Sequence, residues 1–242
     1  MRIILFGGTT EGRLLAEKLT GWGHSVTVSV ATPIGAEGLA GVRVLAGRLE
    51  EDAMTDRVRG FDLCVDATHP YARAAHETIK TACTRAGVPR CRVSRPPSEE
   101  AGCIVVGSAE EAAAYLRGTE GSILLTTGAK EIAAFRELSA GRLFARVLPT
   151  HESLDACESI GLPHRNILAL WGPFSAELNA ALLRQYAIRW LVTKDGGKAG
   201  GFFEKLRAAA ETDTAVLLIR RPQDTGLSVE TFLDELRKGV IP

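Results

Sequence analysis

The chain has 242 residues, which is enough for one large domain or two small ones with a substantial hydrophobic core. Its 29 lysine and arginine residues balance 29 aspartate and glutamate residues, so nucleic acid is not expected as the main partner. The sequence shows neither a signal peptide nor a run of apolar residues long enough to span a membrane, so we expect neither.

The cysteine pattern argues against a disulfide framework and against a metal site. The five cysteines are an odd number, they form no C-x-x-C pair, and no histidine ligands accompany them. Reduced thiols suit the cytoplasm, which is the location we expect. No bound metal is predicted.

The chain begins with a pattern typical of a phosphate-binding turn. A predicted strand over residues 2–6 runs into Gly7-Gly8-Thr9-Thr10-Glu11-Gly12-Arg13, and a predicted helix covers residues 11–21. Glycines allow a sharp turn and a close approach to a ligand, and the start of a helix attracts an anion. However, Thr9 stands where the dinucleotide fingerprint G-x-G-x-x-G has its middle glycine. We expect the hydroxyls of Thr9 and Thr10 to replace that glycine as donors to a pyrophosphate; the loop alone is equally compatible with a structural turn.

Short β-branched runs alternate with amphipathic stretches along the whole chain, which is typical of parallel sheets covered by helices. We therefore predict an α/β fold of two Rossmann-like, doubly wound parallel-sheet domains. In the first half the predicted strands are 2–6, 26–31, 42–45, 62–66 and 90–93, and the predicted helices are 11–21, 50–59 and 72–86.

A proline pair within Arg95-Pro96-Pro97-Ser98 marks the expected domain boundary. Residues 1–96 are predicted to bind NADP(H), and residues 97–242 to contribute to substrate binding, with the active site in the cleft between the two domains. In the second half the predicted strands are 103–106, 122–126, 143–147, 167–171, 189–193 and 215–219, and the predicted helices are 108–117, 130–138, 153–159, 175–186, 201–210 and 228–238.

The segment after the second strand favours NADPH over NADH. It reads Ser29-Val30-Ala31-Thr32 and lacks the carboxylate with which NAD-binding folds usually hold the ribose hydroxyls. Ser29 and Thr32 can donate to a 2′-phosphate, and Arg48 after the third strand is a candidate counter-charge.

The segment from Asp66 to Tyr71 follows the strand expected beside the glycine loop. A lone histidine before a proline is usually structural, but this position lies close to where a nicotinamide would bind. We therefore regard Thr68 and His69 as cofactor contacts, and His69 and Tyr71 as candidate proton donors. Asp66 is expected to cap the next helix or to anchor the loop.

Loops of the second half carry cations and glycines at predicted strand ends. Lys194 and Lys198 alternate with glycines before a predicted helix, and carboxylates are their natural partners, although a solvated loop is the alternative. No Walker loop, serine nucleophile elbow or zinc-protease motif is present, so kinase and hydrolase chemistry are not expected.

The second half also contains Gly172 to Ser175 with Asn179, Val192 to Asp195, Gly200-Gly201 and Glu204-Lys205. Together with the segments above, these residues resemble the precorrin-6A reductase family of corrin-ring (vitamin B12) biosynthesis, including its cobalt-precorrin members. The resemblance covers almost the whole chain. It departs from the family pattern at Gly196, where a serine is frequent, and at Trp171, where a polar residue is expected. It is carried by those segments of the second half together with Gly7 to Arg13 and Asp66 to Ala72.

The resemblance implies NADPH-dependent reduction of one C=C bond of precorrin-6A to give precorrin-6B, with Lys194 a third candidate proton donor. The alternatives are an NADH-dependent cobalt-precorrin-6A reductase, another NADPH reductase acting on a small carbonyl compound, and a non-catalytic NADPH-sensing module. Neighbouring pathway enzymes are possible donors of the substrate. The expected cofactor contacts are Gly7, Gly8, Thr9, Thr10, Glu11, Gly12, Arg13, Ser29, Thr32, Thr68 and His69. The expected substrate contacts are Arg13, Tyr71, Arg73, Thr127, Ser175, Lys194, Asp195, Lys198, Gly200 and Gly201.

Overall fold

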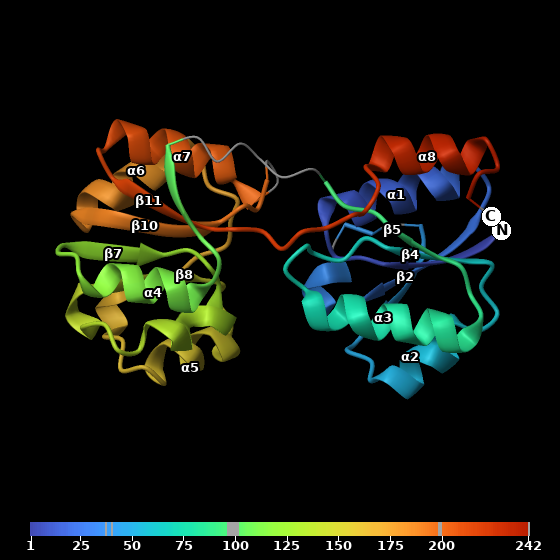
Figure 1. Cartoon of the computed structure of the whole chain (residues 1–242), viewed down its shortest axis with the longest axis horizontal. Coiled ribbons are helices and arrows are strands. Elements are labelled where there is room, and N and C mark those ends of the chain that lie inside the picture. Colours follow the sequence, from blue (N-terminus) through green and yellow to red (C-terminus); the bar gives the residue numbers. More distant parts are fainter. Residues whose placement is uncertain (37, 40, 96–101, 198–199, 242) are drawn as a thin grey trace. The chain divides into compact units, whose positions relative to one another are not determined.

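The computed structural model of the chain describes residues 1–36, 38–39, 41–95, 102–197 and 200–241. It divides into two compact units, one formed by Met1–Pro96 with Pro222–Pro242 and the other by Pro97–Arg221. Each unit contains one all-parallel sheet, of five strands in the first and six in the second (Figure 1). The predicted α/β class with two doubly wound parallel sheets is confirmed.

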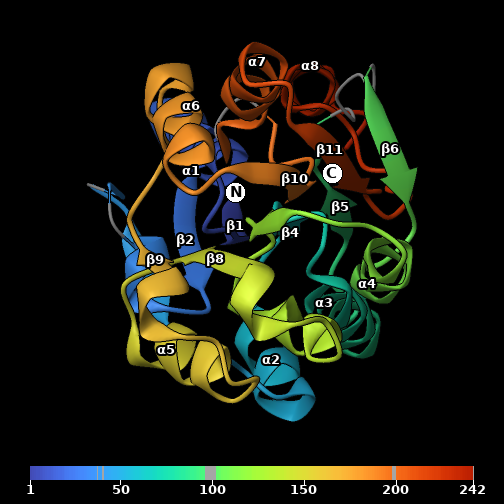
Figure 2. The same cartoon turned by 90° about the vertical axis from the view of Figure 1, so that its left-hand side faces the viewer.

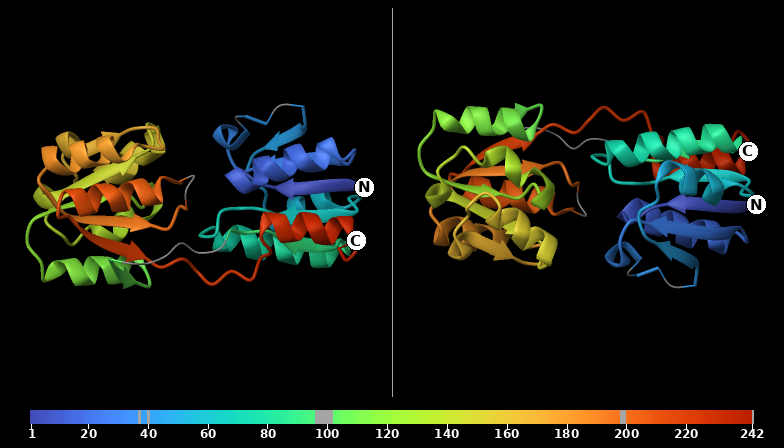
Figure 3. Two further views of the ribbon diagram at one scale, coloured as in Figure 1. Left: turned by 90° about the horizontal axis from the view of Figure 1, so that it is seen from above. Right: turned by 90° about the horizontal axis from the view of Figure 1, so that it is seen from below.

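The first unit has the strand order β3-β2-β1-β4-β5. Side chains of β1 alternate between the two faces of the sheet. Ile3 and Leu5 pack with α1 and α8, while Ile4 and Phe6 pack with α2 and α3. Figure 1 shows α1 and α8 on one face of this sheet and α2 and α3 on the other, and the two views of Figure 3 look onto these faces from above and from below. The elements are β1 (Arg2–Phe6), α1 (Thr10–Gly21), β2 (Ser25–Val30), the 3₁₀ helix η1 (Pro33–Ala36), β3 (Arg43–Ala46), α2 (Glu51–Val58), β4 (Leu63–Asp66), α3 (Arg73–Ala86), β5 (Arg90–Arg92) and α8 (Val229–Arg237).

The C-terminal segment belongs to the first unit, so its assignment to the second domain was wrong. Leu227 accepts a hydrogen bond from the main-chain N–H of Ser94 at 2.9 Å and donates one to the main-chain oxygen of Arg92 at 2.9 Å. Phe232 of α8 is fully buried in the same apolar cluster as Leu15 of α1. The amphipathic pattern of residues 228–238 predicts a helix with one buried face, but it does not specify which sheet covers that face.

The second unit has the strand order β6-β11-β10-β7-β8-β9. One face of its sheet packs against α4, α5 and η2, and the other against α6 and α7 (Figure 2). The elements are β6 (Cys103–Val106), α4 (Ala109–Arg117), β7 (Ser122–Leu125), the 3₁₀ helix η2 (Ala129–Phe135), the 3₁₀ helix η3 (Ala140–Arg142), β8 (Leu143–Val147), α5 (His151–Glu158), the 3₁₀ helix η4 (His164–Asn166), β9 (Ile167–Ala169), α6 (Ala176–Gln185), β10 (Ile188–Lys194), α7 (Phe202–Glu211) and β11 (Ala215–Ile219).

One predicted α-helix is a 3₁₀ helix. The segment predicted as a helix over 130–138 forms η2 over Ala129–Phe135. In a 3₁₀ helix residues three apart lie above one another, which lets both Ile132 and Phe135 enter the core. Among the described helices, none combines the length and apolar character needed to cross a membrane.

Candidate functional site

The sheet of the first unit has a topological switch point between β1 and β4. The chain proceeds from β1 to β2 and β3 on one side and returns to β4 and β5 on the other. The connections that leave β1 and β4 therefore diverge, which opens a crevice at the carboxyl ends of these two strands. The glycine loop of residues 7–13 and the loop of residues 67–72 follow these strands.

The glycine loop is closed by a close approach of its own backbone. A Cβ atom on Gly12 would lie 3.1 Å from the Cα of Gly7, so a side chain at this position would push the loop apart. Gly8 has a φ of +104°, which favours glycine. The sequence prediction of a tight glycine turn directly before a helix is thus matched in the geometry.

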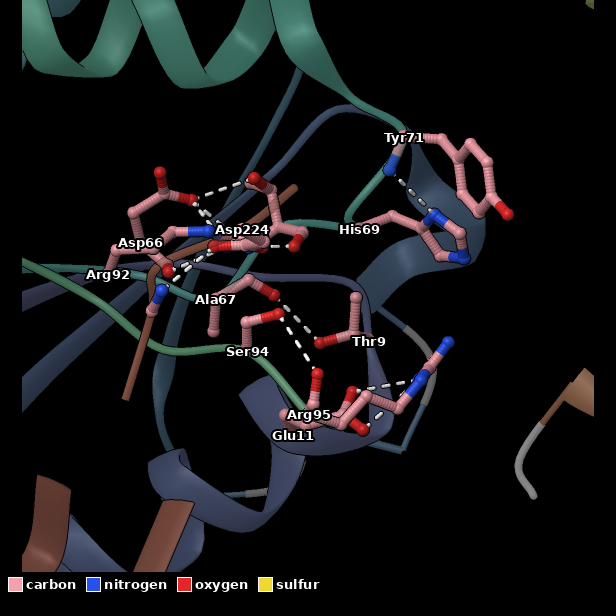
Figure 4. A network of polar contacts seen from close by, with 12 residues as sticks. Thr9, Glu11, Asp66, Ala67, His69, Tyr71, Arg92, Ser94, Arg95 and Asp224 are labelled. Carbon is pink, nitrogen blue, oxygen red and sulfur yellow. Dashed lines mark hydrogen bonds and ion pairs between the residues drawn. The ribbon is translucent and has the colours of Figure 1, made fainter. Parts of the chain in front are cut away.

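Thr9 joins the two loops of the switch point (Figure 4). Its Oγ1 donates to the main-chain oxygen of Ala67 at 2.8 Å and accepts from the N–H of Gly12 at 3.1 Å, as the N-cap of α1. The single hydroxyl proton is therefore used within the protein, contrary to the expectation that it donates to a pyrophosphate. Main-chain N–H groups at the start of α1 remain the natural anion donors of this loop.

Glu11 is neutralised by an arginine that the sequence analysis did not identify. Nη1 of Arg95 lies 3.1 Å from Oε1 and 3.4 Å from Oε2 of Glu11, and both side chains are largely buried. This ion pair balances the negative charge that Glu11 places in the first turn of α1. Arg95 follows β5, and only its position before a proline distinguishes it in the sequence.

A buried ionic network holds the second loop of the crevice (Figure 4). Asp66 is 0% exposed, and its carboxylate accepts hydrogen bonds from Oγ1 of Thr68 at 2.7 Å, from Arg90 at 2.8 Å and from Arg92 at 3.2 Å. Arg92 also contacts Asp224 of the C-terminal segment at 2.7 Å. Asp66 therefore anchors its loop, which was one of the two roles expected for it.

His69 and Tyr71 stand together at the end of this loop. Their rings are stacked with centroids 5.5 Å apart, and the main-chain N–H of Tyr71 donates to Nδ1 of His69 at 3.4 Å. A neutral imidazole that accepts at Nδ1 carries its proton on Nε2. His69 is exposed, as is Arg73 at the start of α3, so both residues are accessible at this edge of the sheet.

The residues expected to select the nucleotide differ in accessibility. Ser29 is only 5% exposed, and its main-chain oxygen accepts from the N–H of Gly7 at 3.0 Å. Thr32 and Arg48 are exposed after β2 and β3. The side chain of Arg13 lies against Gly38, in the segment that follows β2.

The sheet of the second unit has its switch point between β7 and β10, and residues predicted to bind substrate lie there. Oγ1 of Thr127 is buried without a hydrogen-bond partner among the described residues. Lys194 forms an ion pair with Glu131, so its charge is balanced within the protein.

Four other predicted substrate residues take part in loops and helix caps of the second unit. Asp195 is 4% exposed, and its Oδ1 accepts from the N–H of Gly197 at 2.9 Å. Ser175 caps α6, since its hydroxyl accepts from the N–H of Leu178 at 3.3 Å. Gly201 is the N-cap of α7 with a φ of +65°, and Gly200 precedes it. Lys198 lies outside the described residues.

Arg146 and Lys205 are buried cations that residue-by-residue reasoning missed. Nη1 of Arg146 donates to Oδ1 of Asn179 at 2.7 Å, and its guanidinium lies 4.4 Å from the centroid of the Phe174 ring. Nζ of Lys205 donates to Oγ1 of Thr193 at 3.2 Å. Asn179 and Lys205 were identified in the sequence only through the family resemblance. For Arg146, the sequence feature that could have identified it is a charged residue inside an otherwise apolar strand.

The comparison with known families decides the assignment. The model of the family "Precorrin-6x reductase CbiJ/CobK" matches residues 2–237. The chain belongs to this precorrin-6x reductase family. The match covers both units, including the C-terminal segment that returns to the first sheet.

Individual relatives of this reductase cover nearly the same length. A cobalt-precorrin-6A reductase of Priestia megaterium is 36% identical over 241 residues, which are 95% of this chain and 94% of the relative. A precorrin-6A reductase of Mycobacterium tuberculosis (strain H37Rv) is 36% identical over 235 residues, covering 91% and 89% of the two chains. The structure of a CobK precorrin-6A reductase has a TM-score of 0.79 at 25% identity and covers 100% of this chain and 98% of its own.

Membership of the family makes this reductase an oxidoreductase of cobalamin biosynthesis that reduces precorrin-6A or cobalt-precorrin-6A. The family resemblance predicted from the sequence is confirmed. A reductase of this family also implies a nicotinamide cofactor.

Proposed function

We propose that this reductase uses NADPH to reduce one C=C bond of precorrin-6A, which yields precorrin-6B. The first unit binds the nucleotide and the second unit contributes to substrate binding. The proposal is carried by the hydrogen bond from Thr9 to Ala67, which joins two loops at the switch point of a parallel sheet. This is the position at which open α/β sheets bind dinucleotides.

The residues of this loop fit a pyrophosphate. The close packing of Gly12 on Gly7 brings the main chain to the crevice, and the N–H groups of residues 8–11 lie at the start of α1. The carboxylate of Glu11, which would repel a phosphate, is balanced by Arg95. When bound, the nicotinamide supplies the hydride for the reduction.

The absence of a carboxylate in residues 29–32 supports NADPH rather than NADH. Thr32 and Arg48 are the exposed donors that we assign to the 2′-phosphate. The nearly buried Ser29 contributes its main-chain oxygen to the glycine loop and is a weaker candidate for this role.

Reduction of a C=C bond also requires a proton, for which His69, Tyr71 and Lys194 are our candidate donors. The side chain of His69 is exposed, accepts a hydrogen bond at Nδ1 and stacks against the ring of Tyr71. Lys194 has its charge held by Glu131. The variants His69→Gln, Tyr71→Phe and Lys194→Met test each donor through the turnover of saturating substrate. Unchanged turnover in all three variants would show that none of these side chains is the essential proton donor.

A second candidate substrate is cobalt-precorrin-6A, which the relative from Priestia megaterium is named for. The deciding experiment supplies the purified chain with precorrin-6A or cobalt-precorrin-6A and with NADPH or NADH, and follows the absorbance of the reduced nicotinamide. Fastest oxidation with precorrin-6A and NADPH supports the proposal. Nucleotide binding without substrate-dependent oxidation would instead support a sensing module.

A further inference from the structure

Two buried cations lie on the same face of the second sheet. In β8, Leu143, Ala145 and Val147 pack toward α4 and α5, so the alternation of the strand turns Arg146 to the opposite face, under α6 and α7. Thr193 of β10 projects to that face as well, because its neighbour Val192 packs in the cluster with α4 and α5. Arg146, Thr193 and Lys205 thus form a polar cluster beneath α6 and α7. It lies next to the apolar cluster under these helices, on the side of the carboxyl ends of the strands.

Arg146 is held in place without a counter-ion. It is 7% exposed, and its guanidinium is fixed by the amide oxygen of Asn179 and by the Phe174 ring beneath it. No carboxylate of the described ranges lies within ion-pair distance of it. Burial lowers the pKa of Arg146 to about 10, which still leaves the group charged at neutral pH.

Lys205 of α7 has a similar environment. It is 9% exposed and donates to the hydroxyl of Thr193, again without a carboxylate at ion-pair distance within the described part of the chain. The charged groups that influence it are Arg146 on β8, Asp195 after β10, and its neighbour Glu204. Burial and the charge of Arg146 lower the pKa of Lys205 to about 8, because they outweigh the two carboxylates.

A purely structural role does not account for this pair. Two like charges removed from water repel each other, and apolar side chains of similar volume would pack here at lower cost. Neutral hydrogen bonds to Asn179 and Thr193 orient the two cations but do not neutralise them. The carboxylates of Asp195 and Glu204 act on Lys205 only from beyond ion-pair distance and do not outweigh burial and Arg146. An external anion would neutralise the two cations.

We propose that Arg146 and Lys205 form a binding site for a carboxylate side arm of the tetrapyrrole substrate, an inference that rests on the proposed function. The planar guanidinium binds a carboxylate through two parallel N–H donors, and the ammonium of Lys205 adds a third. Asn179 and Phe174 fix the plane of the guanidinium, so the site is preorganised. It holds one arm of the macrocycle and thereby sets the orientation of the ring.

The first test uses uroporphyrin, a stable tetrapyrrole with carboxylate arms, as the probe. Its affinity for the full-length chain is measured by fluorescence titration for the parent protein and for Arg146→Gln, Lys205→Met and Arg207→Met. Arg207 is exposed on the same helix as Lys205 and serves as the matched control. We expect about tenfold weaker binding for each of the first two variants and less than about twofold change for the control. Equal losses in all three variants, or no loss in the first two, would overturn the proposal.

The second test separates binding from folding. A bound carboxylate raises the pKa of Lys205, so the parent protein takes up a proton on binding the probe above pH 8, and its affinity falls as the pH rises through this range. Lys205→Met removes this dependence if Lys205 contacts the anion. A pH dependence that persists unchanged in a folded Lys205→Met variant contradicts the site.

The test also distinguishes this site from the proposed reaction. If the chain oxidises NADPH with precorrin-6A, the two variants should raise KM for the macrocycle about tenfold and leave KM for NADPH unchanged. An active enzyme with unchanged KM values in both variants refutes the carboxylate site alone. An inactive parent enzyme that still binds uroporphyrin through Arg146 refutes the proposed reaction alone.

Discussion

The hydroxyl of Thr9 donates to the main-chain oxygen of Ala67 across 2.8 Å and joins loops that are 58 residues apart in the sequence. The same hydroxyl caps α1 by accepting from Gly12. A glycine at this position, as in the common dinucleotide fingerprint, would provide neither bond. Thr9, which replaces the middle glycine of the fingerprint, therefore joins the glycine loop to the loop that follows β4.

Replacement of Thr9 by valine tests this connection. Valine has a similar shape but no hydroxyl, so it removes a helix cap and leaves the oxygen of Ala67 without this donor. We expect the free energy of unfolding to fall by about 1–2 kcal/mol. Denaturant unfolding measures the change, and Thr9→Ser, which keeps the hydroxyl, should lie close to the parent protein. A Thr9→Val variant as stable as the parent protein would show that the hydrogen bonds of this hydroxyl do not contribute to stability.

The ion pair between Glu11 and Arg95 predicts a rescue. Arg95→Met leaves the charge of Glu11 uncompensated at the start of α1, which should weaken NADPH binding about tenfold. The double variant Glu11→Gln/Arg95→Met removes both charges and should restore the affinity to within about threefold of the parent protein. Calorimetric titration with NADPH measures all three affinities. Failure of the double variant to recover would mean that Arg95 itself contacts the nucleotide.

Asp66 is expected to be the most sensitive acidic residue of the first unit. Asp66→Asn removes the buried charge that faces Arg90 and Arg92, and it should lower the free energy of unfolding by about 3–5 kcal/mol. The control is Asp56→Asn, which breaks an exposed pair with Arg59 and should cost less than about 0.5 kcal/mol. Denaturant titrations of both variants give the comparison. Similar losses of stability in the two variants would show that burial does not determine how much these ion pairs contribute to the free energy of unfolding.

Much of the fold could be predicted because periodicity reports directly on local structure. The alternation along β1 and the glycine turn before α1 are visible in the sequence without any tertiary information. The position of α8 was not, because its amphipathic face fits either sheet. Arg146 illustrates the same limit: the pattern of β8 shows that it faces away from Leu143 and Ala145, but not that α6 and α7 cover it.

The candidate site could be predicted from the sequence only in those parts that a single loop forms. The glycine loop and the Asp66 segment lie at strand ends, and topology alone brings strand ends together. The partners that complete them are distant in sequence: Arg95 lies 84 residues from Glu11, and Asp224 lies 132 residues from Arg92. Such pairings depend on tertiary packing and leave no local signal.

The pKa of Lys205 predicts a pH dependence of stability. Burial and Arg146 lower this pKa from 10.5 to about 8, so between these values the unfolded chain holds a proton that the folded chain has released. The contribution of Lys205 to the free energy of unfolding therefore rises with pH across this window. Lys205→Met should abolish the rise and, by removing a buried charge, should stabilise the protein at pH 7 by about 1–2 kcal/mol. Denaturant unfolding of both proteins from pH 7 to pH 10 checks this, and destabilisation at pH 7 would assign Lys205 a structural role.

Hydride transfer from NADPH to precorrin-6A is the reaction that we propose for this chain. It is tested most directly by mixing the purified protein with both compounds and following the nicotinamide absorbance together with the mass of the macrocycle. We expect NADPH to be oxidised only when precorrin-6A is present, and the product to be heavier by two hydrogens. Substrate-independent oxidation, or binding of both compounds with no change in the mass of the macrocycle, would contradict it.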